Sequence, residues 1–200
     1  MDPFPSPSDS QFELALKTRR EALQEMGVSL GLMFVMGATG LQAQNSPAQA
    51  RAKGTPWLKL TPLEGRTLEA LGDTLLPGAA AAGIAHYIDR QLASDTPLLM
   101  LKYLDFPMAF LDFYRQGLAA LEALAQRRLQ RSFADLTAAQ RTDLVRVISG
   151  ANPDGWNGPP APLFYFATRS DAVDVVYGTP EGFGKLGVPY LPHIAPRQKW

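Results

Sequence analysis

The chain has 200 residues, of which 46% are hydrophobic and 19% charged, a composition typical of a globular protein with one core. Nineteen basic side chains balance nineteen acidic ones, so no strong positive field favours binding to nucleic acid. Because the sequence contains no cysteine, disulfides, thiolate metal sites and a cysteine nucleophile are excluded within this chain.

The segment 18–44, TRREALQEMGVSLGLMFVMGATGLQAQ, has the three parts of a bacterial export signal. Lys17, Arg19 and Arg20 supply the positive charge of the first part. The apolar run 28–41 is the second part, and it is too short for a membrane span, which needs about 20 residues. Small residues follow it, as expected at a cleavage site.

The arginine pair resembles that of a twin-arginine signal, in which Ser or Thr precedes the two arginines and Phe follows at the second place after them. Thr18 fits this pattern, whereas Ala22 stands where Phe is preferred. We therefore expect a twin-arginine-type signal peptide over residues 1–43. Cleavage after Ala43 and cleavage after Ala50 are both compatible with the small residues present.

The next segment, 44–57, is polar and contains Pro and Gly, which predicts a linker after which regular structure begins. Thr61 and Glu64 then form a capping box, and Pro62 suits the first helical position. These residues predict a helix that ends before Pro77.

Apolar residues at helical spacing predict further helices along the chain. The predicted helices cover residues 83–93, 97–103, about 107–131, 137–150 and 161–177. Thr137 and Gln140 form a second capping box at the start of 137–150, and Phe164 and Ala167 are expected on the buried side of 161–177. Because no alternating strand pattern occurs, the predicted fold is mainly α, with a compact helical domain over residues 58–200. From about residue 178 we expect a Pro-, Gly- and aromatic-rich extended segment, because four prolines there prevent long regular structure.

The aromatic side chains of this C-terminal segment need a place to be buried, since full burial of a large apolar group contributes roughly 1.5–3 kcal/mol. One possibility is that the segment folds over the helices of its own chain. The other is that part of it lies on a partner, where aromatic anchors commonly dominate the binding energy. The sequence leaves both open.

Few side chains have the arrangement that catalysis or metal binding needs. His86 and His193 are the two histidines, and neither has another ligand at metal-binding spacing. Asp171 and Asp174 share one face of a predicted helix, for which a solvated surface is the simpler interpretation. The glycine-rich run 178–187 lacks the order of a nucleotide-binding loop. We therefore predict no catalytic, cofactor-binding or metal-binding residue in this chain.

Three parts of the sequence nevertheless resemble one known family, and the export signal adds to the likeness. They are FYRQGLAALEALAQRRLQRSFADLTAAQRTDLVRVISG, Trp156, and LFYFATRSDAVDVVYGTPEGFGKLGVPYLPHI. Over residues 58–200 the chain resembles the gluconate 2-dehydrogenase subunit 3 family, with FxxLTxxQR and YG…GF…LGVPYLxHIxP as the most specific motifs. That family includes the small subunits of bacterial membrane-associated FAD-dependent glucose, gluconate, sorbitol and fructose dehydrogenases.

The resemblance implies a non-catalytic small subunit. In such complexes a large GMC-type catalytic subunit binds FAD and oxidises the sugar or polyol, and a multihaem cytochrome c subunit often completes the electron path. The small subunit carries the signal, helps the large one to mature, and accompanies it through the export translocase as a folded pair. The expected location is therefore the periplasm, in a complex associated with the inner membrane. Substrate specificity belongs to the large subunit.

The family pattern also implies which residues form or support the surface between the subunits. They are Trp156, Tyr177, Phe183, Tyr190 and His193. Two alternatives remain. One is an independent periplasmic enzyme or ligand-binding protein that uses His86 or His193, and the other is a chain that keeps its apolar segment as an anchor for a different complex.

Overall fold

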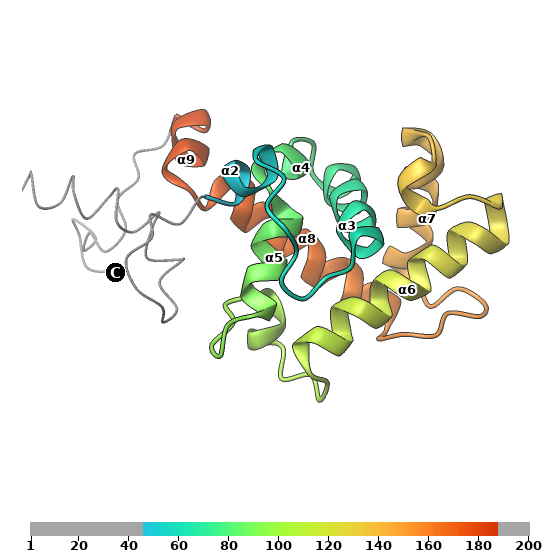
Figure 1. Cartoon of the computed structure of the whole chain (residues 1–200). Helices are drawn as coiled ribbons and strands as arrows, with labels where there is room; N and C mark the ends of the chain where they lie inside the picture. Colours follow the sequence, from blue (N-terminus) through green and yellow to red (C-terminus); the bar gives the residue numbers. More distant parts are fainter. Residues whose placement is uncertain (1–45, 188–200) are drawn as a thin grey trace, which may run out of the picture. The chain divides into compact units, whose positions relative to one another are not determined.

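The computed structural model describes residues 46–187, all of whose regular elements are helices (Figure 1). The α-helices are α2 (Pro47–Ala52), α3 (Pro62–Leu75), α4 (Ala79–Ala82), α5 (Ile84–Leu92), α6 (Phe110–Leu129), α7 (Ala138–Gly150), α8 (Ala161–Tyr177) and α9 (Pro180–Lys185). Two 3-10 helices, η1 (Met100–Tyr103) and η2 (Phe133–Asp135), lie in the connections. The prediction of a mainly α fold is confirmed for this part of the chain.

The two capping boxes predicted from the sequence start α3 and α7. The Glu64 backbone N–H donates to the Thr61 hydroxyl at 3.3 Å, and the Thr61 N–H donates to the Glu64 carboxylate at 2.6 Å. Thr137 and Gln140 make the same reciprocal pair at the start of α7. Each box satisfies backbone donors that the first turn of a helix leaves without a partner.

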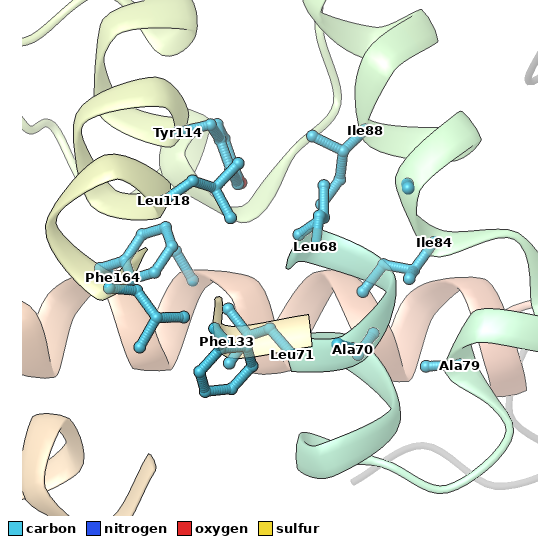
Figure 2. Packing of buried hydrophobic residues seen from close by; sticks show 14 of the residues in the cluster. Leu68, Ala70, Leu71, Ala79, Ile84, Ile88, Tyr114, Leu118, Phe133 and Phe164 are labelled. Atoms are coloured by element: carbon cyan, nitrogen blue, oxygen red, sulfur yellow. The ribbon is translucent and has the colours of Figure 1, made fainter. Parts of the chain in front are cut away.

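Helices α3 and α8 lie at the centre of the core. α3 packs against every helix from α4 to α8, and α8 packs against α3 to α7 and α9. In Figure 2, Leu68 of α3 lies beside Ile88 of α5, and Phe164 of α8 lies beside Leu118 of α6. All four side chains are buried. Long-range packing of apolar faces therefore holds the helices in place.

Gly117 allows α6 and α8 to approach closely. A Cβ atom at this position would lie 2.3 Å from the ring of Phe164, which is closer than two carbon atoms tolerate. Phe164 is fully buried there and also contacts Phe113 and Trp156 with its ring. The packing of these aromatic rings in the core thus requires glycine at position 117 of α6.

Regular structure begins earlier than the sequence predicted. Helix α2 lies inside segment 44–57, which we interpreted as a linker, and Ala50 is only 5% exposed. α2 packs against α4 and α5, where Gly83, with a φ of +85°, lets the Pro47 carbonyl come close. The pattern was missed because the helix has six residues and buries one small side chain, too little for a periodic signal.

The chain between α2 and α3 is fixed to the helices by polar contacts. The Asp89 carboxylate of α5 accepts the backbone N–H groups of Leu58, Lys59 and Leu60 at 2.7, 2.8 and 2.8 Å. Arg115 of α6 donates to the carbonyl of Lys59. Because charge-assisted hydrogen bonds are stronger than neutral ones, Asp89 and Arg115 fix this segment to α5 and α6.

The expected extended segment from residue 178 is also partly wrong. Residues 180–185 form helix α9, which the Thr179 side chain caps by accepting the Gly182 N–H at 3.1 Å. Pro180 occupies the first helical position, where its missing N–H has no partner to lose. Residues 188–200 lie outside the described residues.

Candidate partner-binding surface

Helix α8 carries apolar side chains on its outer side as well as on its buried side. Phe166 is 45% exposed, Val173 is 40% exposed and Tyr177 is half-buried. Their spacing of seven and four residues places them along one side of the helix, and we call these three residues the outer stripe of α8. The outer side of a surface helix ordinarily carries polar side chains. No described element covers the outer stripe fully.

Polar residues border the outer stripe. Arg169 and Asp174 are exposed, and Ser170 is half-buried between them. Partial burial raises the pKa of the Asp174 carboxyl above its ordinary value. An apolar centre with a polar rim is the usual anatomy of a protein–protein interface.

The predicted interface residues do not form one cluster. Trp156 is half-buried, its indole N–H donates to the Pro159 carbonyl at 2.6 Å, and its ring lies 6.3 Å from that of Phe164. It therefore closes a loop onto the core at the start of α8. Tyr177 and Phe183 lie near the other end of this helix, about 25 Å away along its axis.

The remaining predicted positions have no structural counterpart here. The two interface residues Tyr190 and His193, and the signal residues Arg19 and Arg20, lie outside the described residues. Their roles stay predictions.

Phe166 and Val173 were not singled out from the sequence, although a signal for them was present. The predicted buried positions of α8 included Phe164 and Ala167, and both are buried. With those residues inward, helical geometry places Phe166 and Val173 on the opposite side. The signal was the presence of apolar residues among the polar ones on this outer side, where an ordinary surface helix carries mainly polar side chains.

Asp171 corrects the sequence analysis. We interpreted Asp171 and Asp174 as one solvated pair, but Asp171 is fully buried. Its carboxylate accepts the hydroxyl of Tyr114, and the Met100 backbone N–H donates to it at 2.8 Å. The prediction failed because both partners are far away in sequence, on α6 and η1. The contacts join three elements of the core.

Burial raises the pKa of Asp171 from its ordinary value of 3.8 to about 7, with hydrogen bonds from Tyr114 and Met100 acting in the opposite direction. The same loss of water, with the negative charge of Asp171 beside it, raises the pKa of Tyr114. Burial, together with the negative charge of Asp171, also raises the pKa of Tyr87 on α5. These groups form a buried polar centre between α5, α6, η1 and α8.

His86, one of the two histidines that an independent enzyme or ligand-binding protein could use, makes structural contacts. Its Nε2 atom lies 3.1 Å from the Thr55 carbonyl oxygen, and its ring lies 4.3 Å from the ring of Trp57. A carbonyl accepts only, so Nε2 carries the proton. His86 thus helps to fix the chain before α3. Among residues 46–187, no three His, Cys, Asp or Glu side chains are grouped as a metal site would require.

The comparison with protein families agrees with the motifs. The family model described as gluconate 2-dehydrogenase subunit 3 matches residues 62–196, from the first residue of α3 to beyond α9. No curated protein and no solved structure matches the chain. Within the described residues, none of the helices has the length and apolar character needed to cross a membrane. The match covers more than half of the sequence, and its name is consistent with an accessory subunit of a dehydrogenase complex. The chain belongs to the gluconate 2-dehydrogenase subunit 3 family.

Proposed function

We propose that this protein is the non-catalytic small subunit of a periplasmic FAD-dependent dehydrogenase that oxidises a CH–OH group of a sugar or polyol. It binds the GMC-type catalytic subunit, helps it to mature, and is exported with it. FAD is bound by the catalytic subunit. A multihaem cytochrome c subunit, where the complex has one, takes up the electrons.

Export begins at the signal in this scheme. Arg19 and Arg20 direct the chain to the twin-arginine translocase, which moves folded proteins. The catalytic subunit crosses the membrane bound to this chain, with its flavin already in place. The complex then remains associated with the periplasmic face of the inner membrane.

The observation that carries the binding role is the outer stripe of α8 in a member of this family. Single apolar side chains are common on protein surfaces, but here three that are exposed or half-buried lie along one side of the same helix. Two of the three are aromatic, and aromatic side chains are enriched among the residues that dominate binding energy. We propose that the catalytic subunit covers Phe166, Val173 and Tyr177.

Charge substitutions in the outer stripe test this assignment. The double variant Phe166→Glu/Val173→Glu places two carboxylates on the proposed contact, so recovery of the catalytic subunit with a tagged small subunit should fall at least about tenfold. Co-expression followed by affinity purification and flavin absorbance measures the effect.

Leu63→Glu is the matched control. Leu63 is 45% exposed, as Phe166 is, but lies on α3. A glutamate in the first turn of a helix is favourable, so this variant should fold well and keep its partner. If the double variant remains folded and recovers as much flavoprotein as wild type, the stripe is not the contact. The chain's own residues 188–200 would then be the candidate for covering it.

A further inference from the structure

We propose that Arg141 of α7 binds a carboxylate of the catalytic subunit and forms a second contact between the two subunits, on a different helix from the outer stripe. The proposal rests on the proposed function, because it takes the catalytic subunit as the partner. It adds the chemistry of one further contact, an ion pair.

Arg141 stands on the buried side of α7. It precedes Leu144, Val145 and Ile148 by three, four and seven positions, a spacing that places all four residues on one side of the helix. The three apolar residues are buried, and Arg141 is half-buried. A charged side chain in such a position ordinarily has a partner that compensates for the loss of water.

The Arg141 guanidinium has no such partner within residues 46–187. Its Nε atom is closed off from solvent and makes no hydrogen bond, and none of the ion pairs in this part of the chain includes Arg141. The Arg115 Nε also makes no hydrogen bond, but it lies 3.5 Å from the Glu64 carboxylate, and the same guanidinium donates to the Lys59 carbonyl. Buried polar atoms without a partner are rare in native proteins, so that of Arg141 needs an explanation.

The structure explains the other residues of the motif FxxLTxxQR. Phe133 and Leu136 are buried, and Thr137 and Gln140 form the capping box of α7. Arg141 is the remaining position. It lies near the N-terminal end of α7, where the helix dipole does not favour a positive charge. Folding alone therefore gives no reason for this charge.

A carboxylate is the group that fits this guanidinium best. A guanidinium presents its N–H donors in a planar fork that matches the two oxygens of a carboxylate, and the two groups have opposite charges. Arginine is also among the residues that commonly dominate the binding energy of protein interfaces. Because α7 packs against α8, the ion pair and the outer stripe belong to neighbouring helices.

Dissociation of the complex measures the contribution of Arg141. Arg141→Met removes the charge and every donor but keeps an unbranched side chain, so the packing of its stem is retained. The purified complex of the full chain with its catalytic subunit should dissociate at concentrations about tenfold to a hundredfold higher in this variant. Arg146→Met is the matched control on the same helix, because Arg146 is exposed and pairs with Asp143 at the surface. Its dissociation constant should stay within about twofold of wild type.

Unfolding of the full chain without its partner separates binding from folding. Since the Arg141 side chain makes no hydrogen bond or ion pair with the described residues, Arg141→Met should leave the midpoint temperature unchanged or raise it. A midpoint lowered by more than about 4 °C would show that the guanidinium has a partner inside its own chain, which overturns the proposal. A complex of Arg141→Met that dissociates like wild type overturns it as well.

A crosslink identifies the chemistry of the partner group. Arg141→Lys places an amine at this position, and a water-soluble carbodiimide joins an amine to a neighbouring carboxylate as an amide while the reagent takes up the water. Mass spectrometry of the treated complex should find position 141 linked to a carboxylate of the catalytic subunit. Arg146→Lys is the positive control, because Asp143 of the same chain lies beside it. A link from position 141 to its own chain, or no link while the control is linked, overturns the proposal.

The outcomes also separate this proposal from the proposed function. If Arg141→Met binds like wild type while Phe166→Glu/Val173→Glu binds weakly, the ion pair alone is overturned and the role as a small subunit stands. If the wild-type chain binds no catalytic subunit, the proposed function fails and the ion pair fails with it.

Discussion

The hydroxyl of Tyr114 on α6 donates a hydrogen bond to the buried carboxylate of Asp171 on α8, at the centre of the helical domain. The other oxygen of this carboxylate accepts the Met100 backbone N–H of η1. A buried carboxyl group is costly unless its hydrogen bonds are made. The contact therefore fixes the relative position of three elements and makes the stability of the domain depend on pH.

The free energy of unfolding should depend on the protonation of Asp171. Its pKa is about 7 in the folded protein and near 3.8 in the unfolded chain, so the folded state holds the proton more tightly. The stabilisation is then fully present below about pH 4 and is lost as the pH rises through about 7. A difference of about three pKa units corresponds to roughly 4 kcal/mol. Urea unfolding of wild type and Asp171→Asn at about pH 5 and pH 8 measures the part that is lost between these two pH values, about two pKa units or roughly 3 kcal/mol.

Asp171→Asn should remove this pH dependence, whereas Asp174→Asn, one helical turn away, should leave most of it. Tyr87 and Tyr114 stay protonated over this range because burial raises their pKa. The prediction fails if wild type and Asp171→Asn lose the same free energy of unfolding between the two pH values.

Tyr114→Phe should destabilise the fold while keeping its shape. The substitution removes the hydroxyl that donates to Asp171 and leaves a buried carboxylate oxygen without that partner, a loss of roughly 1–3 kcal/mol. Tyr165→Phe is a suitable control because Tyr165 is only partly buried on α8. Thermal unfolding, monitored by circular dichroism, compares the midpoint temperatures of the two variants. Equal midpoints would show that the hydrogen bond from Tyr114 to Asp171 does not stabilise the fold.

Gly117→Ala should destabilise the domain by roughly 1–3 kcal/mol, because the added methyl group overlaps the ring of Phe164 in a packed core. Gly150→Ala, at the end of α7, has nothing within 4 Å of the added atom and should be neutral or slightly stabilising. Denaturant unfolding of the two variants separates a packing effect from the general preference of helices for alanine. Equal effects would show that the approach of α6 to α8 is not tight.

Asp89→Ala should loosen the chain before α3. Three backbone N–H groups lose their acceptor, so we expect a loss of roughly 2–4 kcal/mol and faster proteolysis within residues 53–60. Asp95→Ala, which changes an exposed residue just beyond α5, should have little effect. Limited proteolysis with mass spectrometry locates the cuts. Protection of residues 53–60 equal to wild type in Asp89→Ala would contradict the assigned role.

Local signals in the sequence were sufficient for the main helices. The capping boxes of Thr61 and Thr137 and the spacing of apolar residues depend on neighbours within a few positions, so they can be recognised without a structure. The helix α2 was missed because its stability comes from α5, not from its own pattern. Asp171 was misjudged because its partners, Tyr114 and Met100, lie 57 and 71 positions away in the chain.

The candidate surface was only half predictable. Aromatic residues near the C-terminal end were expected to bind a partner, yet Trp156 packs against its own core, and no local pattern distinguishes these two uses of an aromatic side chain. The exposed position of Phe166 follows from which face of α8 is buried, and that depends on the surrounding helices. Family membership could be predicted from the sequence because motifs are recognised from residue identities and spacing, without knowledge of how the helices pack.

The most direct test of the account is the fate of the catalytic subunit with and without this chain. The two are produced together, and the catalytic subunit is also produced alone, at matched levels in the same bacterial host. Flavin content and dehydrogenase activity are then measured in the periplasmic and cytoplasmic fractions. The account predicts a soluble, flavin-loaded catalytic subunit in the periplasm only when this chain is present. An equally flavin-loaded, equally exported catalytic subunit in its absence would contradict the central claim.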